Sequence, residues 1–391
     1  MPSGLLGMSL LISSQVLSGW AMNDLELDAD YLRQVLRSLL DIPSPTGMTD
    51  QAVSFVCDQL ENLGVAYELT RRGAIRADLR GAQSSPDRAI VTHLDTLGAV
   101  IKGFHAANGW PRLSPIGTWS ARFAEGARVT VHSDDGIETT GTILPLKASG
   151  HVYGDEIDQQ PSTWANLELR LDERISCEAD VRDLGIHVGD IVSIHPEPFF
   201  TKNGFICSRH LDNKAGVAVV LTMAKALLDS GASLPMDCHL LFTISEEVGV
   251  GASHIMHGDV AELVSVDNGT IASVQYTCDY GVTVAMQDST GPFDWHLTRS
   301  LLSLCKDFKI DHSRDVFNHY RSDAASALEA GSDIREALLC FAVDSSHGYE
   351  RTHIDSLLAL GRLLALYAQT SALFFRDART IGPKGDLVAA E

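Results

Sequence analysis

The sequence predicts an α/β protein whose mixed sheet is flanked by helices and whose chain carries an inserted small all-β domain. Apolar, β-branched runs alternate with segments of helical periodicity up to about residue 109. From 110 to 199 helical periodicity disappears, and short β-like runs bounded by Gly, Asp, Asn or Pro replace it. The α/β pattern then resumes. We therefore expect residues 23–109 and 200–391 to form one α/β domain, interrupted by a barrel-like domain at 110–199.

The first part of the chain predicts two helices followed by strands. Apolar residues have helical spacing from Asp28 to Leu40 and again from Thr49 to Leu63, with the proline-containing segment 41–47 between them. Apolar runs bounded by turn residues then predict strands at 66–69, 74–79 and 89–95. Inside the inserted domain the same signals predict strands at 128–132, 140–144, 167–171 and 190–194.

Strand and helix signals alternate again after residue 200, as in a sheet with helical connections. The expected helices are 214–228, 293–308, 323–330 and 353–375, and the expected strands are 240–244, 261–267, 280–286 and 337–343.

Residues 1–22 carry no charged side chain and are only mildly apolar. A signal peptide would need a basic start, and a transmembrane helix would need about 20 apolar residues. We expect a disordered or mis-started extension, with the folded chain beginning near Met22. An atypical export signal is the alternative.

Composition excludes several classes of partner. The 391 residues carry a formal net charge of −21, from 51 acidic and 30 basic side chains. Nucleic acid and anionic membranes both need a basic face, so neither is expected as a partner. The seven cysteines are dispersed and form no Cys-x-x-Cys pair. Such a set indicates reduced thiols in a cytoplasmic protein rather than a disulfide framework.

Metal-capable side chains follow the ends of several predicted strands. The apolar run 240–244 leads directly into two adjacent carboxylates, which are costly beside a buried strand unless a positive group meets them. In open, mostly parallel α/β sheets, ligands bind at the carboxyl edge of the strands. The side chains expected at this edge are His93, Asp95, Asp212, Glu246, Glu247, Asp267 and His347.

Each of these residues also has a purely structural interpretation. Glu246 and Glu247 could form the acidic first turn of a helix, and Asp212 could cap the helix that follows it. A lone His-x-Asp pair, such as His93 and Asp95, is more often a chance surface pair than a metal site. Capping alone does not explain why so many strand ends carry only His, Asp and Glu.

The donor types indicate a particular chemistry. Two imidazoles with several carboxylates suit zinc, cobalt or manganese. Two such ions, about 3.5–4 Å apart, could share a bridging carboxylate and lower the pKa of a water towards neutrality. A carboxylate outside the ligand set could then act as general base. Because neighbouring side chains point apart, one of Glu246 and Glu247 can reach a metal while the other faces the water.

The same residues carry a resemblance to a known enzyme family. The motifs, in chain order, are His93-Leu-Asp95, Leu211-Asp-Asn-Lys-Ala-Gly216, Glu246-Glu-Val-Gly-Val-Gly-Ala252, Val266-Asp267 and a late His347. This order resembles the co-catalytic metallo-aminopeptidases, and most closely a divergent subfamily of the tetrahedral and glutamyl aminopeptidases. The resemblance extends from about Met22 to Phe374. It implies a phosphorylase/hydrolase-like sheet with an inserted β domain.

The resemblance implies a two-metal aminopeptidase that hydrolyses the N-terminal residue of short peptides or peptide-like amides. The family's inserted β domain makes dimer contacts within shells that are often dodecameric, so a homo-oligomer is implied as well. The implied roles are terminal ligands of one metal for His93 and Asp267, terminal ligands of the other for Glu247 and His347, bridging ligand for Asp212, general base for Glu246 and orientation of His93 for Asp95.

The sequence departs from the family pattern in two places. Thr96 stands where the family usually has Glu after the His-x-Asp motif. After His347, a Gly-Tyr pair replaces the usual Ser/Thr-Pro turn, and Glu350 follows three residues on instead of four. The departures bear on the substrate side of the site more than on the metals, and they leave His353 as an alternative last ligand.

Two other functions compete with the aminopeptidase. A related two-metal N-acyl amino acid deacylase or carboxypeptidase usually has a glycine-rich stretch after its bridging Asp, whereas here Asn213 and Lys214 follow. A non-catalytic, metal-binding oligomeric scaffold would have no chemical reason to keep the base Glu246.

Overall fold

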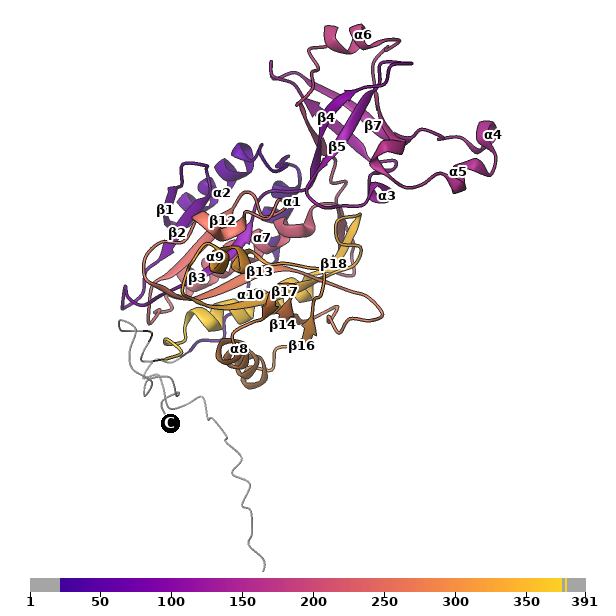
Figure 1. Cartoon of the computed structure of the whole chain (residues 1–391). Helices are drawn as coiled ribbons and strands as arrows, with labels where there is room; N and C mark the ends of the chain where they lie inside the picture. The colour runs from indigo at the N-terminus through magenta and orange to yellow at the C-terminus, as the bar shows by residue number, and fades with distance from the viewer. Residues whose placement is uncertain (1–21, 375–376, 378–391) are drawn as a thin grey trace, which may run out of the picture.

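The computed structural model describes residues 22–374 and 377. The extension predicted at 1–22 therefore lies, apart from Met22, outside the described residues. Within them the chain forms a large α/β body, from which a smaller β unit projects (Figure 1). This arrangement confirms the predicted fold class.

The α/β body is built on a nine-stranded mixed sheet. Its strands are β1 (Ala66–Leu69), β2 (Ile75–Leu79), β3 (Asp87–His93), β12 (Cys238–Thr243), β13 (Val260–Thr270), β14 (Val282–Asp288), β15 (Gly291–Pro292), β16 (His312–Val316) and β17 (Arg335–Val343). They are ordered β1-β2-β12-β3-β13-β17-β14-β15, and β16 pairs with β14. The four strands β12, β3, β13 and β17 run parallel in the centre, so their carboxyl ends share one edge.

The parallel centre of the sheet is buried on both faces. Every residue of β3 and β12 is buried, as expected for strands covered by helices. Helix α7 (Leu211–Ser230) packs against β3 and β13 and also contacts α1 (Ala29–Leu40) and α10 (Ile354–Ala368). Because it is covered from several sides, α7 is apolar nearly all round. The body also contains α2 (Asp50–Asn62), α8 (Trp295–Asp307), α9 (Asp323–Glu329) and the short helix η2 (Gly251–His254).

The smaller unit is a six-stranded antiparallel sheet with its own apolar core. Its strands are β4 (Gly98–Phe104), β5 (Pro111–Ile116), β6 (Arg128–His132), β7 (Glu138–Pro145), β8 (Leu167–Leu171) and β9 (Ile191–Ile194). They are ordered β5-β4-β9-β6-β7-β8, and the edge strands β5 and β8 contact each other, so the sheet curls towards a barrel. Its short helices are α3 (Ala121–Ala124), α4 (Gly150–Tyr153), α5 (Glu156–Gln159), η1 (Trp164–Asn166) and α6 (Glu178–Asp183).

The inserted unit begins earlier than predicted. Strand β4 starts at Gly98 and pairs with β5 and β9, so the predicted boundary at residue 110 is wrong. Glycine within β4 and two prolines within β5 interrupt the apolar runs that would have predicted these strands.

The C-terminal helix is shorter than predicted. It was expected to span 353–375, but α10 ends at Ala368. The side chains of Gln369 and Thr370 bond the carbonyls of Ala365 and Tyr367, and these bonds replace further helical turns. A small third sheet, formed by β10 (Phe199–Phe200), β11 (Phe205–Ser208) and β18 (Glu350–His353), precedes this helix. Among the described helices, none combines the length and the apolar character needed to cross a membrane.

Candidate metal centre

Parallel pairing brings the predicted site residues to one edge of the sheet. His93 is the last residue of β3 and lies opposite Thr243, the last residue of β12. Glu246 and Glu247 follow Thr243 in the next turn. Asp267 lies on β13, two residues beyond Ser265, which pairs with Val91 of β3. The strand register alone therefore places four of the predicted side chains together.

Asp212 lies between the two histidines. Its Oδ1 is 3.2 Å from Nε2 of His93, and its Oδ2 is 3.4 Å from Nε2 of His347. Its backbone torsions are not helical. Its carboxylate accepts a hydrogen bond from the Asn268 amide at 2.7 Å, from a neighbouring strand, instead of capping α7. The two oxygens of one carboxylate thus face two different imidazoles.

The remaining carboxylates divide between the two histidines. Oε2 of Glu247 is 3.8 Å from Nε2 of His347. Nε2 of His93 is 4.0 Å from Oδ2 of Asp267 and 3.9 Å from Oε2 of Glu246. The Glu246 side chain is 17% exposed, whereas that of Glu247 is 4% exposed, so Glu246 is the more open of the adjacent pair.

The sequence predicts that Asp95 orients His93. The structure shows that the backbone carbonyl of Asp95, rather than its carboxylate, makes this contact. Nδ1 of His93 bonds the backbone carbonyl of Asp95 at 2.9 Å, whereas the nearer carboxylate oxygen is 3.7 Å away. The carboxylate instead accepts the backbone N–H groups of Glu246 and Glu247, at 3.0 and 3.3 Å, and the Thr46 hydroxyl at 2.6 Å. Asp95 thus holds His93 with its carbonyl and fixes the Glu246–Glu247 turn with its side chain.

His353 lies outside this cluster. Its Nε2 bonds the carbonyl of Asn203 at 2.8 Å, and its Nδ1 accepts the N–H of Asp355, which caps α10. Its ring packs edge-on against the rings of Phe205 and Tyr280. Of the two histidines left open by the sequence, the structure brings only His347 to the other ligand candidates.

The two histidines should respond differently to the same substitution. We expect His347→Gln to lose metal and at least ~10²-fold in turnover, because removing a direct ligand weakens the site more than removing an outer partner does. We expect His353→Gln to keep both its metal and its turnover. It should lose about 1 kcal/mol of stability, because the His353 side chain caps α10. Metal content by mass spectrometry of the purified variants checks this. A loss of metal in His353→Gln but not in His347→Gln would contradict it.

Three residues that the sequence did not single out as site residues hold the ligand candidates in place. Glu350 is buried and accepts the N–H of His347 at 2.9 Å and that of Asp212 at 3.1 Å. Nδ1 of His347 bonds the carbonyl of Thr118, in the inserted unit, at 2.7 Å. Asn268 binds Asp212, as described above. Only Glu350 carried a sequence signal, as the glutamate displaced by one position from the family pattern.

Asn213 and Lys214 have structural roles. The amide of Asn213 donates to the carbonyl of Val266 at 2.7 Å, and the buried Nζ of Lys214 donates to the carbonyl of Leu39 at 2.8 Å. Their side chains are therefore engaged by the backbone of the fold and do not themselves report on the substrate.

Burial and mutual repulsion govern protonation in the cluster. Burial raises the pKa of Glu246 and of Glu247 well above the usual range, and that of Asp267 to about 7. Burial alone would lower the pKa of His347, but the hydrogen bond to Asp212 and the charge of Glu247 raise it to about 10. Burial alone would raise the pKa of Asp212, but the imidazoles of His347 and His93, 3.4 and 3.2 Å from its oxygens, outweigh burial and lower it.

Without metal, the protein is expected to lose stability as the pH rises from about 5 to 9. Carboxyl groups with raised pKa values hold protons in the native state that the unfolded chain has released above about pH 4. His347 adds in the same direction, because its stabilising proton is lost as the pH rises towards about 10. We expect the melting temperature to fall by ~5 °C or more across this window. Metal-loaded protein, whose ligands are already deprotonated, should not show this fall. Thermal scans with chelator and with zinc at matched pH check both statements, and a flat metal-free profile would contradict the first.

The residues present fit divalent metal ions. Nε2 of His93 and Oε1 of Glu247 are buried and make no hydrogen bond, a costly arrangement unless another group satisfies them. One donor atom each from His93, Asp212 and Glu247 lies within 4.8 Å of the others. Mixed nitrogen and oxygen donors at this spacing suit zinc and its neighbours in the first transition row.

Comparison with known proteins agrees with these motifs. Residues 73–363 match the family described as M42 glutamyl aminopeptidase. YhfE of Bacillus subtilis (strain 168), provisionally named an aminopeptidase, is 35% identical over 337 residues, which cover 86% of this chain and 97% of that protein. The glutamyl aminopeptidase of Lactococcus lactis subsp. cremoris (strain MG1363) is 23% identical over 226 residues, which cover 56% of this chain and 61% of that protein.

Solved structures show the same fold. The TET aminopeptidase of the marine sediment archaeon Thaumarchaeota archaeon SCGC AB-539-E09 has a TM-score of 0.80 at 15% identity, covering 90% of this chain and 98% of that one. The Pyrococcus horikoshii TET1 peptidase, which can assemble into a tetrahedron or a large octahedral shell, has a TM-score of 0.74 at 19% identity, covering 86% and 99%. The family match and the extent of the YhfE alignment decide the identification: the chain belongs to the M42 glutamyl aminopeptidase family and is a hydrolase of the metallopeptidase class.

Proposed function

We propose that this chain is a two-metal aminopeptidase that removes the N-terminal residue of short peptides or peptide-like amides. The observation that carries the proposal is Asp212, whose two carboxylate oxygens face His93 and His347 separately, at 3.2 and 3.4 Å. A carboxylate in this position is suited to bridge two ions. Membership of the M42 family supports the same function.

The surrounding donors divide into two sets. His93 and Asp267 would hold one ion, Glu247 and His347 would hold the other, and Asp212 would be shared. Zinc is the first candidate from the mixed donor types, with cobalt or manganese as alternatives. When bound, such ions lower the pKa of a coordinated water and polarise the scissile carbonyl.

Glu246 is the candidate general base. It is adjacent to Glu247 but more exposed, and it lies 3.9 Å from His93. Burial raises its pKa, which suits a group that must take a proton and give it up again. Its carboxylate would accept the proton of the attacking water and pass it to the nitrogen of the leaving peptide. Asp95, through the two N–H groups that it accepts, keeps Glu246 and Glu247 facing different ways.

The charge of the site favours a free amino terminus. Five carboxylates, those of Asp95, Asp212, Glu246, Glu247 and Asp267, would stand against the four positive charges of two divalent ions, so a protonated α-amine would meet an excess of negative charge. An N-acyl amino acid brings no such cation. This argument, rather than the Asn213-Lys214 pair, separates the aminopeptidase from the related deacylase or carboxypeptidase.

A substrate panel tests the proposal. Protein refilled with zinc, cobalt or manganese is assayed on aminoacyl anilides and on dipeptides, each with a free and with an acetylated N-terminus. We expect hydrolysis only of the free forms. Preferential hydrolysis of acetylated substrates would instead establish the deacylase. Metal-loaded protein that hydrolyses none of them would support the non-catalytic scaffold.

Membership of the M42 family also supports a homo-oligomer built from dimers, up to a dodecamer. Support comes from the TET1 peptidase of Pyrococcus horikoshii, which can assemble into a tetrahedron or a large octahedral shell. All seven cysteines, each within the described residues, are free thiols, which supports a cytoplasmic location. Light scattering after size exclusion checks the assembly, and a strictly monomeric protein at micromolar concentration would contradict it.

A further inference from the structure

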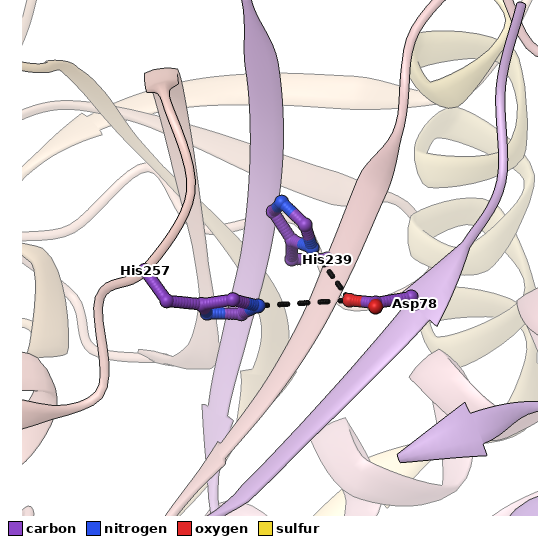
Figure 2. A group of neighbouring side chains, drawn as sticks. All are labelled: Asp78, His239 and His257. Carbon is purple, nitrogen blue, oxygen red and sulfur yellow. Dashed lines mark hydrogen bonds and ion pairs between the residues drawn. The ribbon is translucent and has the colours of Figure 1, made fainter. Parts of the chain in front are cut away.

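A second group of metal-capable side chains lies at the other end of the central sheet. It consists of Asp78 on β2, His239 on β12 and His257 in the segment between η2 and β13 (Figure 2). His239 stands near the start of β12, whereas Glu246 follows the end of that strand. At about 3.3 Å per strand residue, the group is roughly 15 Å or more from the catalytic cluster. It is therefore a separate site.

Both imidazoles point at one oxygen of Asp78. Nδ1 of His239 is 2.7 Å from Oδ1 of Asp78, and Nε2 of His257 is 3.6 Å from the same atom. The two rings lie 4.3 Å apart, tilted by 50°. The three donor atoms lie within 4.8 Å of one another. Figure 2 shows the side chains converging from three separate segments of the chain.

The second ring nitrogen of His239 also lies beside a carboxylate. Its Nε2 is buried without a hydrogen bond and lies 3.3 Å from Oδ2 of Asp87, and the His239 side chain is only 5% exposed. Asp87 is held in turn by the backbone N–H of Asp259, at 3.0 Å. A carboxylate behind the second nitrogen of a histidine is the usual outer partner of a metal-bound imidazole, because it fixes the tautomer and the ring orientation.

We propose that Asp78, His239 and His257 form a third metal site, which binds zinc or a similar divalent ion. Nδ1 of His239, Nε2 of His257 and Oδ1 of Asp78 are its ligands, and Asp87 is the outer partner of His239. Two imidazoles and a carboxylate form a common zinc donor set. The short hydrogen bond between Asp78 and His239 needs to open by only several tenths of an ångström to reach ligand spacing around zinc.

Two nearby arginines do not oppose this cation. Arg80 pairs with Asp237 at 2.8 Å and with Oδ2 of Asp78 at 3.0 Å, which leaves Oδ1 to the histidines. Arg76 pairs with Glu68 and donates to the carbonyl of Ile255. Each positive charge therefore has its own acidic or carbonyl partner, and Arg80 also holds the Asp78 carboxylate in place.

The site has a structural consequence. His257 belongs to the segment that starts at the catalytic Glu246–Glu247 turn and leads to β13, whereas Asp78 and His239 belong to the sheet. An ion bound here would fasten the end of that segment to β2 and β12. Metal binding to the native state alone should then stabilise the fold in proportion to ln(1 + [Zn²⁺]/Kd).

The experiment measures zinc content and position. Metal-free protein is equilibrated with zinc, freed of excess and analysed by mass spectrometry, as wild type and as His257→Gln, Asp78→Asn and His254→Gln. We expect His257→Gln and Asp78→Asn each to bind one equivalent less than wild type, with unchanged aminopeptidase turnover. His254→Gln, the same substitution three residues away, should bind as much as wild type. Circular dichroism establishes that each variant is folded.

The position of the ion is tested on wild-type protein, so the result does not depend on any variant. Crystals grown with zinc should give an anomalous peak, at the zinc absorption edge, between Nδ1 of His239 and Nε2 of His257. Equal zinc content in wild type and His257→Gln, together with no anomalous peak at this position, would overturn the proposal and leave the group as a hydrogen-bonded network.

Discussion

Replacing Glu246 with glutamine should lower turnover by ~10²–10⁴-fold, the usual contribution of a positioned general base. The metal content should not change. The glutamine keeps the shape of the side chain but cannot accept the proton of the attacking water. Glu246 is also the more exposed of the adjacent pair, so the buried donors around Asp212 do not depend on it. Turnover of an aminoacyl anilide, measured at matched metal content, gives the effect.

Glu247→Gln is the matched control, because it makes the same chemical change one residue away. It should lose a metal ion, since its carboxylate lies 3.8 Å from His347 and has a buried oxygen without a partner. Adding excess metal should restore part of its activity but none of that lost in Glu246→Gln. If both variants lost metal, or if Glu246→Gln kept its turnover, the division between base and ligand would be wrong.

Asp212→Asn should have the largest effect on metal binding, because one residue serves both ions. An amide is neutral and offers a single oxygen, so it cannot bridge two cations as a carboxylate does. We expect both ions to be lost, and turnover to fall by about 10³-fold or more as their contribution disappears. Metal analysis and anilide turnover measure the two losses.

Asp294→Asn is a control for the alternative role of Asp212 as a helix cap. Asp294 does cap its helix, accepting the N–H groups of His296 and Leu297 at 3.0 and 2.8 Å. Asparagine caps about as well but loses the ion pair with Arg335 at 3.1 Å, so stability should fall by about 1 kcal/mol, with metals and turnover intact. If Asp212→Asn behaved like Asp294→Asn, Asp212 would not be a bridging ligand.

Much of the sheet could be predicted because its central strands are buried on both faces. Continuous apolar runs such as 240–244 and 337–343 are typical of such strands, and the register that follows puts His93 beside the Glu246–Glu247 turn. Strands β4 and β5 were missed because glycine and proline interrupt them. Their place depends on pairing within the inserted sheet, which no local pattern reveals.

The candidate ligands could be predicted because all of them except Asp212 lie at the end of, or soon after, a strand that the sequence also predicts. The groups that hold them could not. Glu350 accepts the N–H of Asp212 across 138 sequence positions, and Thr118 reaches His347 across 229. Such contacts exist only once the fold has formed. Asp95 is a related case: its motif was found, but which atoms hold His93 depends on the path of the following turn.

The Asp78–His239–His257 group is even harder to predict from the sequence, because it too exists only once the fold has formed. Its members come from three segments with no motif spacing between them, and His239 stands inside a strand whose other residues are mostly apolar. Only the pairing of β12 with β2 brings His239 opposite Asp78. The sequence therefore indicates the candidate site at the carboxyl edge of the sheet, where motifs cluster, but gives no signal for the group at the opposite end.

The most direct test of the two-metal mechanism is a zinc titration of metal-free His257→Gln protein, with turnover of an aminoacyl anilide recorded at each step. This background removes the third site from the count. We predict no turnover without metal and a rise that ends when about two equivalents are bound, the number a shared carboxylate serves. Full turnover in the metal-free protein, or a plateau reached with a single equivalent, would contradict the account.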